Sequence, residues 1–353
     1  MVTEKFAPGA ARRINPLEYP SWDALLASRS DFLFFHGTAW AKVLADTYGF
    51  VPHYFCTGNM DAPETVLPLM EVDSWLTGRR GIALPFTDGC APLGADQAAF
   101  GKIFEAAMAF GKSRGWKYIE CRGGRQMFGE AVPASVSFYG HNLDLSGGEN
   151  VLFEKMDGSA RRAVRKAEKD GVTVEISQSL NAVKVFYSLQ CLTRKRHGLP
   201  PQPFSFFMNI HRHILSQNQG VIALAGHAGK KIAAAVYFFL GGRAIYKYGA
   251  SDFAQQHLRG SNLMMWEAVK WLARNRVKTL NLGKTSLANE GLRRFKLHLG
   301  SQEDKIEYFR HDLRLNRFVT EGDGVSGWHN VVFRTMPVFM SRAAGGLLYR
   351  HWA

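Results

Sequence analysis

The sequence carries one order of elements twice, and this repetition constrains the fold more than any other feature. Three short runs rich in Val, Ile, Tyr and Phe are followed by a helical stretch and another strand-like run. The first copy comprises 52–58, 65–72, 81–86, 100–115 and 116–122. The second comprises 221–227, 232–240, 244–251, 263–276 and 277–283. A tandem duplication of one α/β (α+β) unit is the economical interpretation, and two unrelated domains of the same order remain the alternative.

The length agrees with two units. At about 150 residues per domain, 353 residues predict two domains. We expect a first unit over 1–150, a second over 151–312, and a C-terminal tail over 313–353 that packs back on the body. The stretch 331–353 also has the alternative of an interfacial helix that touches a membrane.

The charge is strongly positive. Lys and Arg number 44 against 30 Asp and Glu, which gives a net charge of +14. This excess favours an anionic partner: phosphate, RNA, a nucleotide-linked substrate or an anionic membrane face. Five basic residues lie close together in a predicted short helix that Asp157 or Ser159 begins and Gly171 ends. We assign Arg161 and Arg165 of this helix to substrate binding, with a solvated basic face as the equal alternative.

Cysteines, targeting signals and metal motifs are uninformative or absent in the sequence. The four cysteines form no CxxC pair, so we expect reduced, mostly buried thiols and no structural zinc. His211 and His213 would diverge on a helix, and we predict no metal site. The N-terminus lacks an apolar signal segment, so the expected location is cytoplasmic or peripheral at a membrane. Four residues of 193–207 are Gly or Pro, which predicts a rigid loop there.

The second copy has the order that surrounds the cofactor site in GNAT acyltransferases. In that superfamily a glycine-rich turn before the helix offers N–H groups to a pyrophosphate. The stretch 255–262 holds Gly260 at one of the two small-residue positions and Asn262 at the other. We assign Gln256, Gly260 and Ser261 to cofactor binding; the alternative is an ordinary helix N-cap by Ser261.

The motifs within 282–300 indicate a particular protein family more specifically. Leu282-Gly283-Lys284 precedes Asn289-Glu290-Gly291-Leu292, and then come Phe295-Lys296 and Gly300. Together with the basic helix and 193–198, these motifs resemble the Fem family of peptidoglycan-bridge aminoacyltransferases and the BioF2-like GNAT proteins of exopolysaccharide clusters. The resemblance covers most of residues 35–310 in the same tandem order.

The resemblance implies two tandem GNAT-like units, each a mixed, mostly antiparallel sheet flanked by helices, with the reaction centre in the second. It implies acyl transfer to an amine without a covalent enzyme intermediate. Lys296 and Phe295 fall on the family's motif beside the reacting carbonyl, where a Lys ammonium stabilises developing negative charge. We assign substrate binding to further residues of this region: Lys284, Asn289, Arg293 and Tyr248.

The sequence leaves the donor, the acceptor and the general base undecided. The donor is aminoacyl-tRNA or acyl-CoA, and we expect no tightly bound cofactor. The acceptor is an amine of a cell-envelope or exopolysaccharide precursor, anionic and lipid- or nucleotide-linked, while DNA is not expected as a partner. The base is His257, Glu267, Tyr248, a water or the substrate itself. The competing functions are a CoA-dependent N-acetyltransferase and a non-catalytic scaffold that binds RNA or a membrane.

Overall fold

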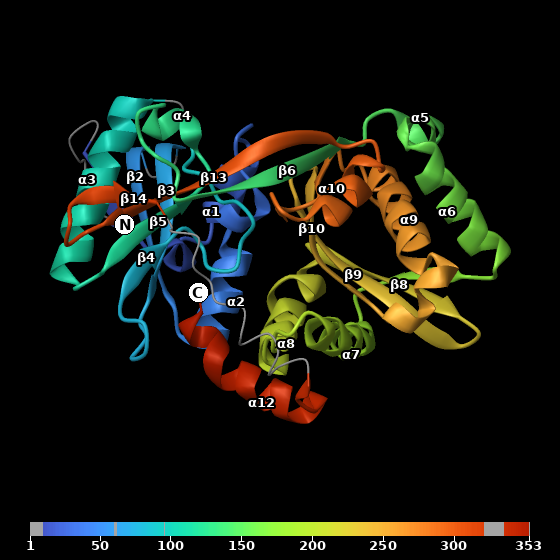
Figure 1. Ribbon diagram of the computed structural model, residues 1–353. Helices are drawn as coiled ribbons and strands as arrows, with labels where there is room; N and C mark the ends of the chain where they lie inside the picture. The colour runs from blue at the N-terminus through green and yellow to red at the C-terminus, as the bar shows by residue number, and fades with distance from the viewer. Residues whose placement is uncertain (1–9, 60–61, 95, 321–334, 353) are drawn as a thin grey trace. The chain divides into compact units, whose positions relative to one another are not determined.

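The computed structural model describes residues 10–59, 62–94, 96–320 and 335–352 (Figure 1). Their internal contacts divide them into two units. Unit 1 comprises the described residues within 1–137, 306–323 and 350–353, and unit 2 those within 138–305 and 324–349. The division runs through two strands, β6 (Val136–Asp144) and β13 (Gln302–Asp312).

Unit 1 is built on a sheet with the order β1-β2-β3-β4-β5-β13, and β14 pairs with β13. Every pairing is antiparallel except that of β4 with β5. Its strands are β1 (Arg12–Ile14), β2 (Val51–Asn59), β3 (Ala62–Val72), β4 (Arg80–Ile82), β5 (Tyr118–Arg122) and β14 (Arg317–Val319). Its α-helices are α1 (Trp22–Ala27), α2 (Thr38–Tyr48), α3 (Gln97–Ser113) and α4 (Arg125–Phe128), and its short 3-10 turns are η1 (Pro16–Glu18) and η2 (Phe34–His36).

Unit 2 repeats this plan. Its sheet has the order β6-β11-β10-β9-β8-β7, with β12 on β6, and only β10 and β11 pair in parallel. The strands are β7 (Thr173–Ser177), β8 (Gly220–His227), β9 (Lys230–Leu240), β10 (Arg243–Ser251), β11 (Thr279–Asn281) and β12 (Thr285–Ser286). The α-helices are α5 (Gly148–Lys155), α6 (Gly158–Lys169), α7 (Leu180–Arg196), α8 (Phe204–His213), α9 (Gly260–Arg274), α10 (Glu290–Leu297) and α12 (Val338–Leu348). Short 3-10 turns are η3 (Leu215–Gln217) and η4 (Phe253–Leu258), while η5 (Tyr349–His351) has only its first residue in unit 2.

The last strand of each sheet is exchanged along the chain. Strand β6 follows β5 in the sequence, yet its residues from Phe138 onward belong to unit 2 and pair with β11 and β12. Strand β13 follows α10, yet its residues from Ile306 onward belong to unit 1 and pair with β5 and β14. Each sheet is thus completed by a segment that the chain supplies from the other side of the duplication.

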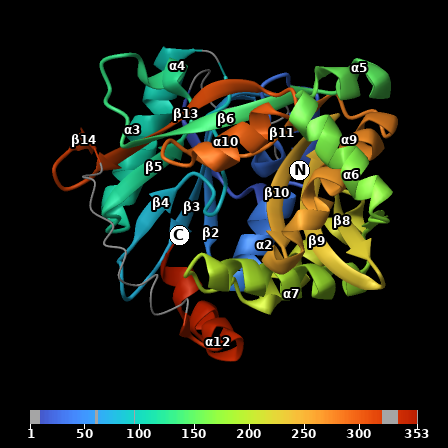
Figure 2. The same ribbon diagram turned by 45° about the vertical axis from the view of Figure 1, so that its right-hand side comes forward.

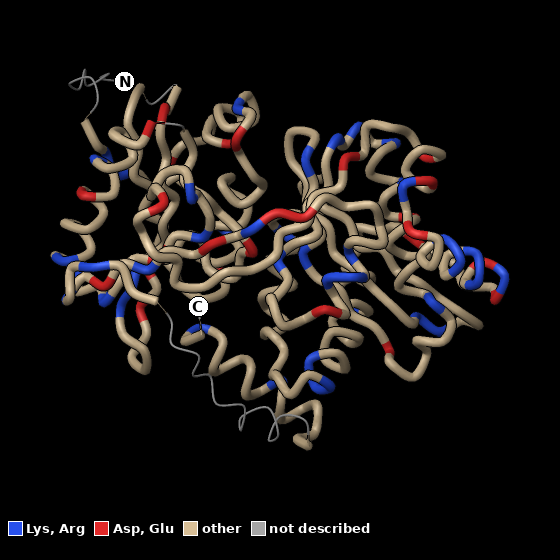
Figure 3. The backbone as a smooth tube through the Cα atoms, turned by 45° about the horizontal axis from the view of Figure 1, so that its top comes forward, with Lys and Arg blue, Asp and Glu red and all other residues tan. Residues whose placement is uncertain are grey.

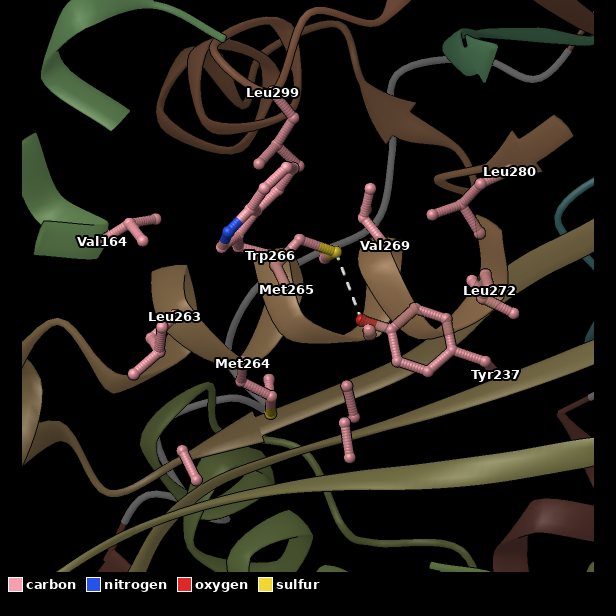
Figure 4. Close-up of a cluster of buried hydrophobic side chains, with 14 of the residues drawn as sticks. Val164, Tyr237, Leu263, Met264, Met265, Trp266, Val269, Leu272, Leu280 and Leu299 are labelled. Carbon is pink, nitrogen blue, oxygen red and sulfur yellow. Dashed lines mark hydrogen bonds between the residues drawn. The ribbon is translucent and has the colours of Figure 1, made fainter. Parts of the chain in front are cut away.

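Helices cover both faces of the sheet in unit 2. Helix α9 contacts β8 and β9 on one face with α6 packed on it, and α7 contacts β8, β9 and β10 on the other face (Figures 1 and 2). Helix α12 packs against α7. The core beneath α9 is apolar and includes Leu263, Met265, Trp266, Val269 and Leu272. Figure 4 shows a hydrogen bond within it, in which the Tyr237 hydroxyl donates to the sulfur of Met265 at 3.2 Å.

The predicted fold class is confirmed, because both copies of the repeated order form the expected strands and helix within a few residues. Asp157 caps α6 by accepting from the N–H of Ser159, and Gly171 adopts a φ of +79° just after it, as predicted. The loop predicted over 193–207 is only partly right. The apolar face of α7 carries that helix on to Arg196, and α8 begins after Pro203, so irregular chain is limited to 197–203.

The four cysteines are buried and unpaired, which confirms the expectation of free thiols. Among the described helices, none combines the length and apolar character needed to cross a bilayer. In the same part of the chain no group of three His, Cys, Asp or Glu side chains is arranged to hold a metal ion.

Candidate active site

The parallel strands of unit 2 separate after a short pairing. Arg243–Ile245 of β10 lie opposite Thr279–Asn281 of β11. Beyond that point β10 continues to Ser251, whereas Leu282 leaves it and donates its N–H to the carbonyl of His141 on β6 at 2.8 Å. The edge of β10 past Ile245 is therefore not occupied by β11. A strand edge of this kind presents main-chain N–H and C=O groups to a ligand.

A β-bulge lies on β10 at the start of this open edge. Tyr246 pairs with Tyr237 and Tyr248 with Val236, so Lys247 is the extra residue. A bulge shifts the alternation of side chains by one. Tyr246 therefore lies on the α9 face, against Tyr237 at 5.6 Å between ring centroids, and Tyr248 turns to the opposite face.

Tyr248 lies in an aromatic cluster formed by α7 and α8. Its ring centroid is 6.2 Å from that of Phe186, 6.4 Å from Phe206 and 5.8 Å from Phe207. The Lys247 ammonium lies 5.1 Å from the Tyr248 ring centroid. The hydroxyl oxygen is shielded from solvent, so the bulge converts a strand tyrosine into a buried polar group beside the open edge.

The predicted cofactor turn lies between β10 and α9. Arg259 adopts a φ of +56°, and Gly260 begins the helix. A Cβ on Gly260 would lie 2.8 Å from Cδ1 of Ile232, so glycine is needed for close packing on the sheet. Ser261 is the second residue of α9, and Arg259 rather than Ser261 occupies the N-cap, which corrects the alternative of a serine cap. Gln256 is exposed in η4, where its carbonyl accepts from the N–H of Arg259 at 3.1 Å.

Lys296 is buried and holds the turn after β11. Its Nζ donates to the carbonyl of Gly283 at 2.9 Å and to that of Lys284 at 3.0 Å, and the residue is 3% exposed. The N–H of Gly283 donates to Oδ1 of Asn281 at 2.8 Å. Hydrogen bonds thus fix this turn at its carbonyl groups, through Lys296, and at the Gly283 N–H, through Asn281. The Lys296 ammonium is buried within the protein rather than solvated. Phe295 beside it is partly buried against the unit 2 core.

The other predicted substrate residues of this region have structural contacts as well. Asn289 caps α10 by accepting from the N–H of Leu292 at 3.1 Å. The ammonium of Lys284 lies 4.1 Å from the ring centroid of Phe138. The arrangement gives Asn289 a local role in starting α10, and it places the Lys284 side chain over an aromatic face of β6.

Arg293 is engaged by acidic partners. Its guanidinium donates to both carboxylate oxygens of Glu303, at 2.7 and 2.9 Å, and to Glu290 at 3.3 Å. It also lies 4.2 Å from the Tyr139 ring centroid. The bond to Glu303 raises the pKa of Arg293 and lowers that of Glu303. An anionic substrate would have to compete with these carboxylates for this guanidinium.

His141 was not singled out by the sequence, yet it lies at the centre of this cluster. The side chain is fully buried on β6, its Nδ1 is 4.0 Å from Oε2 of Glu303, and neither ring nitrogen has a hydrogen-bond partner in the described part of the chain. Burial, reinforced by the charge of Lys296, lowers its pKa to about 4. A polar residue in alternation with Tyr139 on one strand face was the available signal.

The basic helix α6 begins beside the end of α10. The Asp157 N–H donates to the carbonyl of His298 at 2.9 Å, and the Ser159 hydroxyl lies 3.2 Å from His298 Nδ1. The helix buries one stripe and carries its Lys and Arg residues on the rest of its surface (Figure 3). Arg161 is half-buried, while Arg165 is exposed and lies 5.6 Å from the Phe153 ring centroid. The structure thus places the start of α6, though neither arginine by any direct bond, next to the segment that carries Lys296.

The remaining candidate bases differ in their surroundings. His257 is exposed in η4. Glu267 on α9 forms an ion pair with Lys270 at 2.7 Å. Tyr248 is the one of the three that is both shielded and next to the open edge of β10.

Comparisons with known proteins agree with this geometry. Residues 154–303 match the model of the acetyltransferase (GNAT) domain. No curated protein matches the sequence significantly. Among solved structures, FemX superposes with a TM-score of 0.66 at 16% identity, covering 84% of this chain and 96% of FemX.

Two further structures are similar over most of their length. The C-terminal domain of a putative lysylphosphatidylglycerol synthetase from Agrobacterium fabrum has a TM-score of 0.55 at 15% identity, with 84% of this chain and 91% of that one covered. A tandem GNAT protein from the clavulanic acid biosynthesis pathway has a TM-score of 0.53 at 9% identity, with 86% and 98% covered. Residues 154–303 are thus identified as a GNAT acetyltransferase domain, and the chain has a fold similar to that of FemX and of a tandem GNAT protein.

Proposed function

We propose that unit 2 transfers an acyl or aminoacyl group to an amine of a cell-envelope or exopolysaccharide precursor. The observation that carries this proposal is the edge of β10 past Ile245, where β11 no longer pairs with it and where the bulge at Lys247 lies. In GNAT acyltransferases the same order of elements surrounds the acyl donor. The open edge offers main-chain N–H groups to an acyl carbonyl, and the first turn of α9 offers N–H groups to a phosphate.

The chemistry requires few protein groups. The acceptor nitrogen attacks the donor carbonyl, a C–N bond forms, the bond to the leaving oxygen or sulfur breaks, and the nitrogen loses a proton. N–H donors aimed at the carbonyl oxygen stabilise the negative charge that develops on it. Tyr248 is our candidate for contacting the reacting groups, and Lys296 supports the site by holding the turn at Gly283 and Lys284.

We favour an aminoacyl-tRNA donor. Asn262 replaces the second small residue of the GNAT pyrophosphate turn, and the long side chain of Arg259 lies directly before Gly260; both argue against the close approach of a CoA pyrophosphate. The resemblance to FemX extends over nearly the whole of that chain. The name of the lysylphosphatidylglycerol synthetase neighbour states an aminoacylated lipid as its product, which supports a lipid-linked acceptor as well as a nucleotide-linked one.

Acyl-CoA is the second candidate donor. Gly260 keeps the close packing of α9 on the sheet, so the first-turn N–H groups stay at the end of β10. Thermal shift and calorimetry with CoA, acetyl-CoA and deacylated tRNA at two salt concentrations separate the two donors. Salt-sensitive binding of tRNA alone supports the aminoacyl donor, whereas saturable CoA binding favours the second candidate. The Arg161→Glu/Arg165→Glu variant should weaken tRNA binding, and unchanged affinity would remove α6 from the donor site.

Two tyrosines on one strand provide a matched test of the reaction centre. Tyr248→Phe should lower kcat about tenfold, because it removes a shielded hydroxyl beside the open edge. Tyr246→Phe removes a buried hydroxyl from the other face of the same strand and should leave kcat unchanged. Equal kcat for both variants would refute the role of Tyr248, and failure to turn over any aminoacyl or acyl donor would favour a scaffold that binds RNA or a membrane.

A further inference from the structure

Helix α12 has one face committed to unit 2. Ser341 and Gly345 are buried four residues apart, followed by the buried Tyr349. Gly345 lies so close to the carbonyl of Pro201 that a Cβ could not be accommodated there. The guanidinium of Arg342 lies 5.0 Å from the Tyr187 ring centroid. The helix is therefore held on α7 and the following turn by small residues and one stacked arginine.

The opposite face of α12 is apolar and exposed. Phe339 is 72% exposed, Met340 47% and Leu347 73%. Ala343, also exposed, lies between them at helical spacing, so the four residues form one stripe. Isolated exposed apolar residues are ordinary on soluble proteins, but a contiguous stripe indicates an interaction surface.

The chain around this stripe is basic and aromatic. Residues 335–352 contain Arg342 and Arg350 and no Asp or Glu. Trp352, the residue that follows η5, is 44% exposed. The described segment 335–352 thus combines an apolar helix face with basic residues and no carboxylate.

We propose that the exposed apolar face of α12 binds the surface of an anionic lipid bilayer. Apolar side chains on one face of a short helix insert at the boundary between headgroups and acyl chains. Arginines on a segment that contains no Asp or Glu favour anionic lipid. The 11 residues of α12 are too few to span a bilayer, so the helix lies in the plane of the surface. This inference concerns a surface outside the reaction centre and does not depend on the identity of the donor.

Vesicle co-sedimentation of the full chain tests the proposal. The protein should bind vesicles that contain phosphatidylglycerol, bind pure phosphatidylcholine vesicles much less, and lose affinity as salt rises. Phe339→Ser/Leu347→Ser should reduce binding about tenfold or more, because two apolar side chains no longer leave water. Leu315→Ser is the matched control, since Leu315 is 58% exposed in the turn between β13 and β14 of unit 1, and it should bind as the wild type does.

Other outcomes would overturn the proposal. Absence of binding to the anionic vesicles, or equal binding by the double variant, would exclude a lipid surface as the occupant. Light scattering identifies a second copy instead: a wild-type dimer that the double variant converts to a monomer would assign the stripe to self-association. Circular dichroism of both variants verifies that the helix content is retained.

Discussion

The two parallel strand pairs show how one order of elements gives two different results. In unit 1 the chain loops out after β4 and returns to β5: Ala83 N–H donates to the carbonyl of Glu120, and Cys90 N–H to that of Arg122, both at 2.8 Å. In unit 2 the corresponding strands part after Ile245 and Asn281. The edge that remains open in unit 2 is taken up by the chain itself in unit 1.

Side chains reinforce the closure in unit 1. The Arg122 guanidinium donates to the carbonyls of Leu84 and Thr87 and to the carboxylate of Glu120. Burial alone would raise the pKa of Glu120, but Arg122 and Arg310 outweigh it and lower this pKa. A buried ion network is therefore used to hold a loop where unit 2 has an open strand edge. Under the proposed function, the first copy contributes stability and the second contains the reaction centre.

Arg122→Met gives the largest expected effect on stability. It leaves Glu120 with Arg310 as its remaining partner and removes the donor to the 84–87 loop, at a cost of about 3 kcal/mol. Urea unfolding measures this loss. Activity per folded molecule should match the wild type, and a large drop in kcat under native conditions would mean that unit 1 takes part in the reaction.

Lys296→Ala should have the opposite balance of effects, with a larger loss of activity than of stability. It leaves two carbonyls of the turn after β11 without their donor, which costs about 1–3 kcal/mol, and kcat should fall about a hundredfold as the turn loses its position. Single-turnover rates at a temperature where the variant is folded separate the two effects. Lys270→Ala removes another lysine of unit 2 and should be nearly silent. A Lys296→Ala variant with wild-type turnover would reduce this lysine to a structural role.

His141 supplies the smallest effect, and it appears only with pH. Because its folded-state pKa is lowered to about 4 from 6.5, the unfolded chain takes up a proton that the folded chain does not between these values. The free energy of unfolding should therefore decline as pH falls from 6.5 toward 4. His141→Gln should make the decline shallower by up to about one proton. Urea titrations at several pH values measure the slope, and parallel curves for both proteins would contradict the assignment.

Much of the fold follows from local patterns in the sequence. Alternating and helical spacings locate the strands and the crossover helix of each copy, and Asp157 and Gly171 delimit α6 as their capping chemistry predicts. The exchange of β6 and β13 does not follow, because the apolar pattern of a strand specifies a buried face but not which sheet it joins. The bulge at Lys247 could not be predicted for the same reason, because an extra residue is recognised only once the partner strand is known.

The candidate site is predictable to a lesser degree. The resemblance singles out Lys296, but its two carbonyl acceptors at Gly283 and Lys284 are visible only in three dimensions. Arg293 reads as an anion ligand in the sequence and has Glu303 as its partner in the structure. In the sequence His141 is a lone histidine. Its lowered pKa depends on burial and on Lys296, a residue far along the chain.

The strand exchange links the order in which the chain is synthesised to the order in which its units can fold. Residues 306–312, which complete the sheet of unit 1, leave the ribosome only after nearly all of unit 2 has been made. Until then unit 1 lacks the strand that pairs with β5, and an unpaired strand edge is prone to wrong pairing. Contacts this distant in sequence also slow folding. A nascent chain cut before residue 306 is thus not a smaller version of this protein but a state with one sheet unfinished.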